Sequence, residues 1–276
     1  MEKKAKIRLD VYLYEKGYFE SREKARIAIM EGNVYVNNQK EDKPGTIIKE
    51  DAVVEYRGEK LKYVSRGGYK LEKAKEVFKL DFEDKICMDI GASTGGFTDL
   101  MLQGNAKLVY AIDSGTNQLD YRLRTDDRVV VLENTNARYL KKENIKDEYV
   151  DVITIDVSFI SLTKIIPVVK NFLKDDGFLV ALIKPQFEAG KEKVEKNGVI
   201  RDKKVHIDVI DEIVTFCKNE SLYIAGLDFS PIKGPAGNIE FLIYLKKEIC
   251  GVDDDLSKDT LYNIKEVVEV AHATLD

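Results

Sequence analysis

Short apolar stretches alternate along most of the chain with stretches whose apolar positions recur at helical spacing. Beyond residue 84 the apolar stretches predict strands over 85–90, 107–112, 128–132, 150–155, 177–183, 222–229 and 239–246. Helices are expected between them, near 96–103, 116–123, 141–145, 161–173 and 203–219. This alternation is typical of an α/β fold, a mostly parallel sheet with helices on both faces. No helix separates the last two strands, so the final strand is expected to insert antiparallel.

A smaller α+β unit is predicted at the start of the chain, over residues 1–60. The spacing of Leu9, Tyr12 and Leu13 predicts one helix, and Ser21 is expected to cap a second helix that ends at Gly32. Short strands over 34–36 and 52–56 follow. Residues 61–64 are expected to form a linker and residues 65–276 the larger domain. An amphipathic helix is predicted within 251–276, with an apolar face formed by Leu261, Ile264, Val267, Val268 and Ala271.

Composition narrows the class of protein. With 44% hydrophobic and 34% charged residues, the chain of 276 residues is predicted to be globular, with one large and one small domain. The three cysteines lack metal-ligand spacing, no apolar run approaches a membrane span, and no secretory signal is apparent, so a cytoplasmic location is expected. The net charge of −5 disfavours a polyanionic partner, but residues 1–62 hold 14 Lys and Arg against 12 Asp and Glu. No membrane partner, obligate protein partner or metal site is predicted.

A glycine-rich loop follows the first strand of the larger domain and predicts a nucleotide site. The loop consists of Gly91, Ala92, Ser93, Thr94, Gly95, Gly96 and Phe97. Asp89 stands just before it, and Asp113, placed to accept hydrogen bonds from a ribose, ends the second strand. The pattern Gly-x-x-x-Gly-Gly and a single nucleotide unit favour S-adenosylmethionine over a dinucleotide. Asn136 and Ala137 could meet the adenine. Alternatively, the glycines only permit tight packing and Asn136 only caps its loop.

Four residues far apart in sequence are predicted to form a reacting centre. Asp156 and Lys184 each follow a strand at the edge where ligands of such sheets bind. Glu240 opens the final strand, and an antiparallel strand would begin at that same edge. Lys70 is expected in the first turn of a helix before the sheet. Two lysines and two carboxylates suit proton removal from a weakly acidic hydroxyl, with Lys184 as base, Lys70 polarising the hydroxyl, and Asp156 and Glu240 orienting both. The alternative is that they are ordinary charges at strand ends.

Five sequence blocks in order resemble the TlyA family, and the similarity extends over nearly the whole chain. They are Ser65–Lys70, Asp89–Thr98, Asp156–Ser161, Ile183–Glu188 and Phe229–Glu240. The resemblance implies a Rossmann-like, S-adenosylmethionine-dependent methyltransferase fold of the FtsJ type. It further implies ribose 2′-O-methylation of cytidine in 23S rRNA, and in some members 16S rRNA, with an effect on sensitivity to capreomycin-type antibiotics. The family's Lys-Asp-Lys-Glu tetrad falls on the four residues above. The linker pair before Ser65 is Tyr63-Val64, where some relatives have Trp, so its role in coupling RNA and cofactor binding stays open.

The first unit resembles the S4 RNA-binding domain, through Arg8–Asp10, Ser21–Arg26 and Gly32–Asn37. In that family the second helix presents basic residues to RNA phosphates. The residues expected to contact RNA are therefore Arg8, Arg22, Lys24 and Arg26, and in the larger domain Arg66, Phe187 and Lys233. A solvated helix face is the alternative for the first group, since glutamates are interleaved with it, and a lid or core role is the alternative for Phe187.

Other classes of function remain open at this stage. A pore-forming haemolysin is a name attached to the family, but no cationic amphipathic or membrane-spanning segment supports it. A non-catalytic rRNA-binding assembly factor would keep the fold without the reaction, and a small-molecule methyltransferase would not need the S4 unit. His206 and His272 lack partners at metal-ligand spacing and are interpreted as structural or surface residues.

Overall fold

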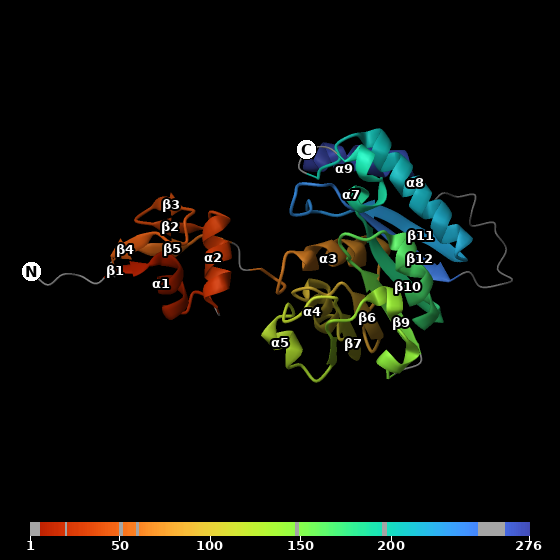
Figure 1. Cartoon of the computed structure of the whole chain (residues 1–276), viewed down its shortest axis with the longest axis horizontal. Helices are drawn as coiled ribbons and strands as arrows, with labels where there is room; N and C mark the ends of the chain where they lie inside the picture. The colour runs from red at the N-terminus through yellow and green to blue at the C-terminus, as the bar shows by residue number, and fades with distance from the viewer. Residues whose placement is uncertain are drawn as a thin grey trace, which may run out of the picture. The chain divides into compact units, whose positions relative to one another are not determined.

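The computed structural model describes residues 6–19, 21–49, 52–58, 61–146, 149–194, 198–247 and 263–276. It divides into two compact units, residues 1–61 and 62–276, whose elements are labelled in Figure 1. Each unit has its own hydrophobic core. Among the described residues, no helix has both the length and the apolar character needed to cross a bilayer.

The smaller unit packs two helices against short strands. Helices α1 (Leu9–Glu15) and α2 (Arg22–Met30) enclose a core to which Leu9, Leu13 and Ile29 contribute fully buried side chains. The side chain of Ser21 accepts a hydrogen bond from the backbone N–H of Lys24, which confirms the predicted cap of α2. Strand β2 (Val34–Val36) pairs with β3 (Gln39–Glu41) and β5 (Val54–Tyr56), while β1 (Lys6–Arg8) pairs with β4 (Ile47–Lys49). Strands β1, β3 and β4 were not predicted, because each is short and contains a lysine, so none forms an apolar stretch like Val34–Val36.

The larger unit is built on a seven-stranded sheet of order β11-β12-β10-β9-β6-β7-β8. Its strands are β6 (Ile86–Ile90), β7 (Leu108–Ile112), β8 (Val129–Leu132), β9 (Val150–Ile155), β10 (Leu173–Ile183), β11 (Leu222–Phe229) and β12 (Phe241–Lys247). Strand β12 lies between β10 and β11 and is antiparallel to both, which confirms the predicted antiparallel insertion. The amino end of β12 therefore shares one edge with the carboxyl ends of β6, β9 and β10.

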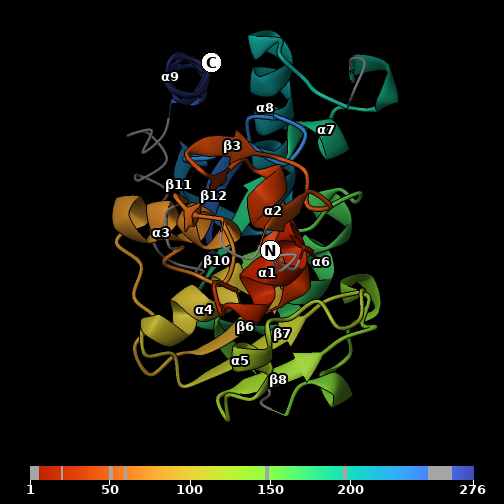
Figure 2. The same cartoon turned by 90° about the vertical axis from the view of Figure 1, so that its left-hand side faces the viewer.

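Helices cover both faces of this sheet (Figures 1 and 2). One core contains residues of α3 (Gly67–Phe78), α4 (Gly96–Gln103) and α5 (Tyr121–Arg124), and the other contains residues of α6 (Ile166–Val169), α8 (Lys203–Asn219) and α9 (Ile264–Leu275). A single turn of helix, α7 (Pro185–Glu188), follows β10. The apolar face predicted for the last helix is observed from Ile264 onward, and Leu261 lies outside the described residues.

Three predicted helices differ in the structure. The stretch 161–173 is divided into short helical pieces before β10, because Pro167 is tolerated only in the first turn of a helix and α6 has to begin next to it. Helix α5 begins only after Asp120, whose carboxylate accepts the N–H of Arg122 and caps it. The stretch 141–145 forms a 3₁₀ turn over Lys142–Asn144 instead of an α-helix.

Candidate active site

The four predicted residues of the reacting centre meet at the edge where the strands end. The ammonium Nζ of Lys70 donates to Oε2 of Glu240 at 2.6 Å and to Oδ2 of Asp156 at 3.3 Å. The Nζ of Lys184 lies 2.5 Å from Oδ1 of Asp156 and donates to the hydroxyl of Ser158 at 3.1 Å. Asp156 thus bridges the two lysines with its two oxygens, and Glu240 contacts only Lys70.

Burial makes these charges interact strongly. The side chains of Lys70 and Lys184 are each 8% exposed, that of Asp156 is 19% exposed, and that of Glu240 is 1% exposed. Burial alone disfavours charge on Lys70, but the carboxylates of Asp156 and Glu240 outweigh it and raise the pKa of Lys70. Burial likewise disfavours the Asp156 carboxylate, yet the two lysines hold its pKa below the usual range. Lys70 is therefore a persistent cation and Asp156 a persistent anion at neutral pH.

Glycines hold the start of α3, and with it Lys70, against the glycine-rich loop. A Cβ atom on Gly96 would lie 2.4 Å from Oγ of Ser65 and 2.6 Å from the backbone N of Gly68. Only glycine allows this close approach between the start of α3 and the start of α4. Gly96 thus serves the tight packing that was the alternative explanation of the loop, and it also lines the cavity beside the tetrad.

Two adjoining cavities lie beside the tetrad. The first, of about 320 Å³, is bounded by the tetrad residues Lys70, Asp156 and Lys184 and by the loop; the second, of about 480 Å³, extends toward Asp113 and Asn136. Gly91, Ser93, Asp156 and Ser158 line both. Because they share these lining residues, they form one cleft, of the size typical of small-molecule sites.

All of the residues predicted to hold the cofactor line this cleft, except Gly95. The first cavity is lined by Asp89, Gly91, Ala92, Ser93, Thr94, Gly96 and Phe97, and the second by Gly91, Ser93, Asp113, Asn136 and Ala137. Gly95 caps α4 with φ +97°, and a Cβ there would lie 2.3 Å from Leu123. Its conformation and packing, rather than ligand contact, require glycine at this position.

Asp89 and Asp113, which with Asp156 are the acidic residues predicted to hold the cofactor, are already hydrogen-bonded within the protein. Asp89 is fully buried and accepts hydrogen bonds from the backbone N–H and the hydroxyl of Thr98 and from the hydroxyl of Thr154. Burial raises the pKa of Asp89 to about 6 although these donors favour its charge. Asp113 accepts backbone N–H groups of Ser93 and Gly115, which leaves further lone pairs on each oxygen. Asn136 caps the turn after β8 through Arg138 N–H, so its loop-capping role and its place in the cavity coexist.

Gly91 offers a direct test of the cleft. Its φ is +83°, and a Cβ atom would lie 2.5 Å from the backbone oxygen of Asp156. We expect Gly91→Ala to lower the free energy of unfolding by about 1–3 kcal/mol and to weaken S-adenosylmethionine binding, measured by thermal melting and by calorimetric titration. Gly198→Ala is the matched control, because Gly198 has φ +75° but open space around it. Equal cofactor affinity in both variants would contradict the account of this loop.

Of the residues predicted to contact RNA, Arg66 and Lys233 line the first cavity. Lys233 also pairs with Asp276, with 2.8 Å between Nζ and Oδ1. Phe187, in α7, is half-buried, and its ring centroid lies 5.1 Å from that of Phe159. Phe159 itself was not predicted as a site residue, yet it is 90% exposed with φ +64°, unusual for an aromatic residue. Its position three residues after Asp156 was the available signal.

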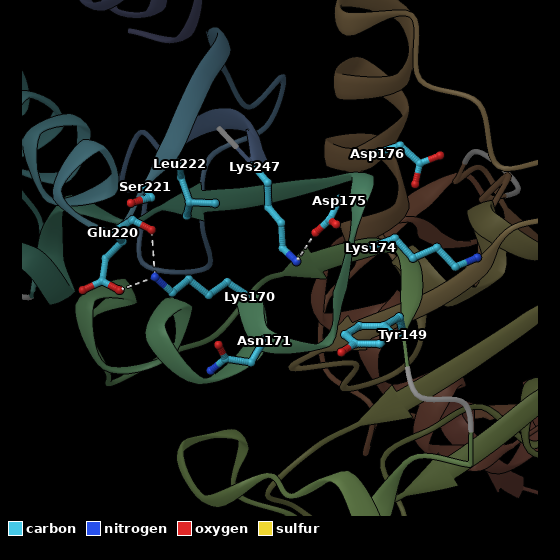
Figure 3. Close-up of a pocket in the computed structure, with 10 residues that line it drawn as sticks. All are labelled: Tyr149, Lys170, Asn171, Lys174, Asp175, Asp176, Glu220, Ser221, Leu222 and Lys247. Atoms are coloured by element: carbon cyan, nitrogen blue, oxygen red, sulfur yellow. Dashed lines mark hydrogen bonds and ion pairs between the residues drawn. The ribbon is translucent and has the colours of Figure 1, made fainter. Parts of the chain in front are cut away.

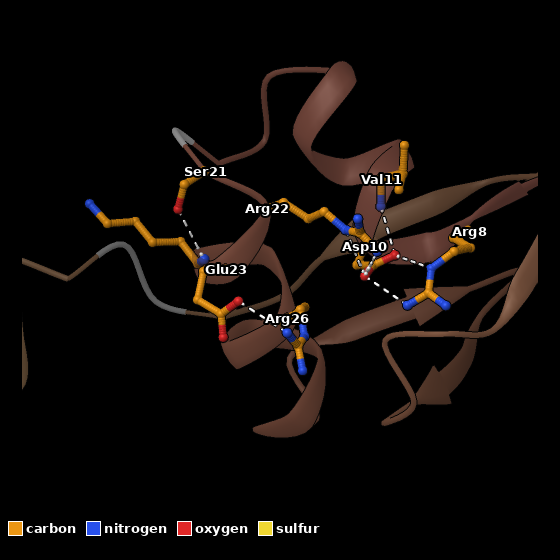
Figure 4. A network of polar contacts seen from close by, with 8 residues as sticks. Arg8, Asp10, Val11, Ser21, Arg22, Glu23 and Arg26 are labelled. Carbon is orange, nitrogen blue, oxygen red and sulfur yellow. Dashed lines mark hydrogen bonds and ion pairs between the residues drawn. The ribbon is translucent and has the colours of Figure 1, made fainter.

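The basic residues predicted in the smaller unit lie in a network of polar contacts, and two of them surround one buried aspartate (Figure 4). Asp10 is fully buried and accepts hydrogen bonds from the guanidinium groups of Arg8 and Arg22, which are about half exposed. Arg26 pairs with Glu23 one turn earlier on α2. This exposed pair agrees with the alternative interpretation, in which the basic residues belong to a solvated helix face. Ser21 and the first turn of α2, which contains Lys24, complete the network through the cap. The structure thus fixes Arg8 and Arg22 next to each other; whether they bind RNA remains a prediction.

A third cavity of the larger unit, at about 770 Å³ the largest of the three described here, lies away from this chemistry (Figure 3). It is lined at the opposite edge of the sheet by residues that include Lys170, Lys174 and Lys247. Each of these lysines is ion-paired, with Glu220, Asp151 and Asp175 respectively. Size alone therefore does not identify the reactive cleft. Among the described residues, no cluster of three His, Cys, Asp or Glu side chains could hold a metal ion.

Comparisons with known proteins follow the division of the chain. The family model described as FtsJ-like methyltransferase matches residues 63–247, and the S4 domain model matches residues 7–54. The chain is 50% identical, over 98% of its length and 95% of the relative, to a protein of Bacillus subtilis provisionally named rRNA methyltransferase YqxC. It is 37% identical to the 16S/23S rRNA (cytidine-2′-O)-methyltransferase TlyA of Mycobacterium tuberculosis, over 87% of this chain and 90% of that one. A solved structure from Streptococcus thermophilus, provisionally described as a hemolysin, superposes with a TM-score of 0.77 at 48% identity and covers 99% of this chain and 98% of that one.

Proposed function

The chain belongs to the FtsJ-like methyltransferase family and has an N-terminal S4 domain, and we propose that it methylates the ribose 2′-hydroxyl of cytidine in ribosomal RNA. Its cofactor is S-adenosylmethionine, as the methyltransferase fold requires. The observation that carries the proposal is the buried cluster of Lys70, Asp156, Lys184 and Glu240 beside a glycine-bounded cleft. The relatives named as rRNA methyltransferases support the choice of substrate.

The cleft suits the cofactor. Gly91 lines both cavities, and Asp113 retains acceptor capacity for a ribose. We infer that the loop from Gly91 to Phe97 holds the amino-acid part, while Asp113, Asn136 and Ala137 hold the adenosine. When bound, S-adenosylmethionine supplies an electrophilic methyl group, whose bond to the positively charged sulfur breaks as an oxygen nucleophile bonds to the methyl carbon.

The contacts of the two lysines suggest different roles. Lys70 contacts two carboxylates and its raised pKa keeps it protonated, so it polarises the ribose hydroxyl as a cation. Lys184 contacts one carboxylate and one neutral hydroxyl, that of Ser158. We therefore assign Lys184 as the base that accepts the 2′-hydroxyl proton, while Asp156 and Glu240 hold the two amines in place.

Phe159 and Phe187 are proposed to hold the target nucleotide. A base removed from its stack needs an aromatic face, and base stacking contributes about 1–3 kcal/mol per base. We expect Phe159→Ala to raise the KM for RNA roughly 5- to 150-fold with little change in stability, because the ring is 90% exposed. Steady-state kinetics and thermal melting measure these effects. The replacement Phe159→Tyr keeps a stacking face and should retain a KM near that of the parent; a large increase there would contradict stacking.

Methyl transfer to ribosomal subunits tests the proposed function. The protein is incubated with tritiated S-adenosylmethionine and, separately, with 30S and 50S subunits from cells that lack this enzyme. We expect label in the RNA of the 50S subunit, and transfer to the 30S subunit would place the protein with relatives that modify both. Cofactor binding without label in any RNA would contradict the proposal and favour a non-catalytic assembly factor. A ribosomal substrate places the activity in the cytoplasm, and we propose no lytic activity.

A further inference from the structure

A continuous chain of polar contacts joins the interior of the larger unit to the rim of the tetrad cavity. Nδ1 of His206 lies 3.0 Å from Nε2 of His272, and Nδ1 of His272 lies 2.7 Å from Oδ2 of Asp276. The other oxygen of Asp276 accepts from Nζ of Lys233 at 2.8 Å. The contacts connect α8 and α9 with the loop 230–238 before β12. The two histidines were interpreted as structural or surface residues, and the structure pairs them in the interior.

The inner end of this chain is rigid. His206 is fully buried, its ring packs edge-on against Phe241, and His272 is 7% exposed. Burial, assisted by His272, lowers the pKa of His206 to about 4, so it is neutral at neutral pH. Because the Asp276 carboxylate can only accept, Nδ1 of His272 has to carry a proton toward it. His272 thus fixes the direction in which the Asp276 carboxylate points.

The outer end of the chain lies on the wall of the reactive cleft. Lys233, Gly234 and Pro235 line the cavity that contains Lys70, Asp156 and Lys184. Backbone hydrogen bonds from Ser230 to Glu240 and from Gly234 to Asn238 tie this loop to the start of β12. Movement of Lys233 is therefore limited by its own loop on one side and by Asp276 on the other.

We propose that Asp276, oriented by His272, is a positioning residue that holds the ammonium of Lys233 at the cavity rim, where Lys233 binds a phosphate of the RNA strand beside the target ribose. The inference rests on the proposed function. A lysine side chain has several rotatable bonds, and fixing it before RNA arrives lowers the entropic cost of phosphate contact. Lys233 has three donors, so it can bind a phosphate while it keeps its bond to Asp276. Helix α9 would then contribute to RNA binding without touching RNA.

The test compares Lys233→Ala, Asp276→Ala and the double variant with the parent protein. The readouts are kcat and KM with 50S and 30S subunits, together with the Kd for S-adenosylmethionine. We expect each single variant to raise the KM for subunits roughly three- to tenfold, with kcat and cofactor Kd unchanged. The double variant should match Lys233→Ala, because Asp276 acts only through Lys233. Asp276→Glu should restore most of the loss.

A matched control separates this role from the docking of α9. Lys203 of α8 and Glu269 of α9 form an ion pair between the same helices that does not reach the loop. Glu269→Gln should leave KM unchanged. An unchanged or lowered KM in Asp276→Ala, or additive losses in the double variant, would overturn the proposal. If the parent protein transfers no methyl group, the proposed function fails, and subunit binding by sedimentation with the same variants still decides the role of Asp276.

Discussion

Replacement of Lys184 by alanine is expected to lower the rate of methyl transfer about 10²- to 10⁴-fold, the usual contribution of a positioned general base. The amine of Lys184 lies 2.5 Å from the carboxylate of Asp156 and 3.1 Å from the hydroxyl of Ser158. Its removal takes away the proton acceptor but leaves the cofactor loop and Asp113 unchanged. The Kd for S-adenosylmethionine should therefore change little. Single-turnover kinetics with labelled cofactor measure the chemical step, and calorimetric titration measures cofactor binding.

Two controls sharpen the test of Lys184. Lys184→Arg retains a cation that cannot lose its proton, so it should be nearly as slow as alanine. Lys247→Ala removes another ion-paired lysine at the far end of β12, next to the largest cavity, and should leave the rate unchanged. A rate within a factor of a few of the parent in Lys184→Ala would refute the assignment of the base. A rate for Lys184→Arg between those of the parent and Lys184→Ala would show that the positive charge accelerates methyl transfer without accepting the proton.

Replacement of Asp156 by asparagine is expected to damage both stability and activity. Asp156 is the carboxylate that both lysines share, and an amide cannot neutralise them. Breaking a buried ion pair in this way costs about 3–5 kcal/mol, which lowers the melting temperature of a domain of this size by roughly 6–20 °C. Methyl transfer should fall below detection, because Lys184 loses the carboxylate that it contacts and Lys70 keeps only that of Glu240. Thermal melting followed by circular dichroism and the labelling assay measure the two effects.

The pH dependence of stability provides a second test of the role of Asp156. The pKa of Asp156 is lowered by folding, so its contribution is present above the ordinary value of 3.8 and is lost as pH falls through the folded value. The pKa of Lys70 is raised by folding, so its contribution is present below 10.5 and is lost as pH rises through the folded value. The parent and Asp156→Asn should therefore differ most between these limits and converge outside them. A constant difference across pH would contradict a charge-based role for Asp156.

Strand ends were the most predictable part of the site. Lys184 follows an uninterrupted apolar run and Asp156 a mostly apolar one, and these runs determine both the strand and the edge at which the charged residue emerges. Glu240 required one further inference, the antiparallel direction of the last strand, which the absence of a helix before it supplied. Lys70 depended more on the resemblance to a known family, since a lysine in a helical first turn is common.

Contacts between distant segments could not be predicted, because no local pattern encodes them. His206 and His272 are 66 residues apart and meet only because α8 and α9 pack side by side on β11. The left-handed conformation of Phe159 arises in a loop without a glycine, so no residue type signals it. The division of the predicted helix 161–173 was signalled by Pro167, but where β10 begins depends on pairing with β9.

The identity of the modified nucleoside tests the central claim most directly. Ribosomal RNA labelled by the parent protein is digested to nucleosides, which are separated and identified by mass spectrometry. The buried tetrad predicts that all label resides in a 2′-O-methylated ribonucleoside, and the relatives support cytosine as its base. Label on a base carbon or a ring nitrogen would contradict a site built to deprotonate a sugar hydroxyl.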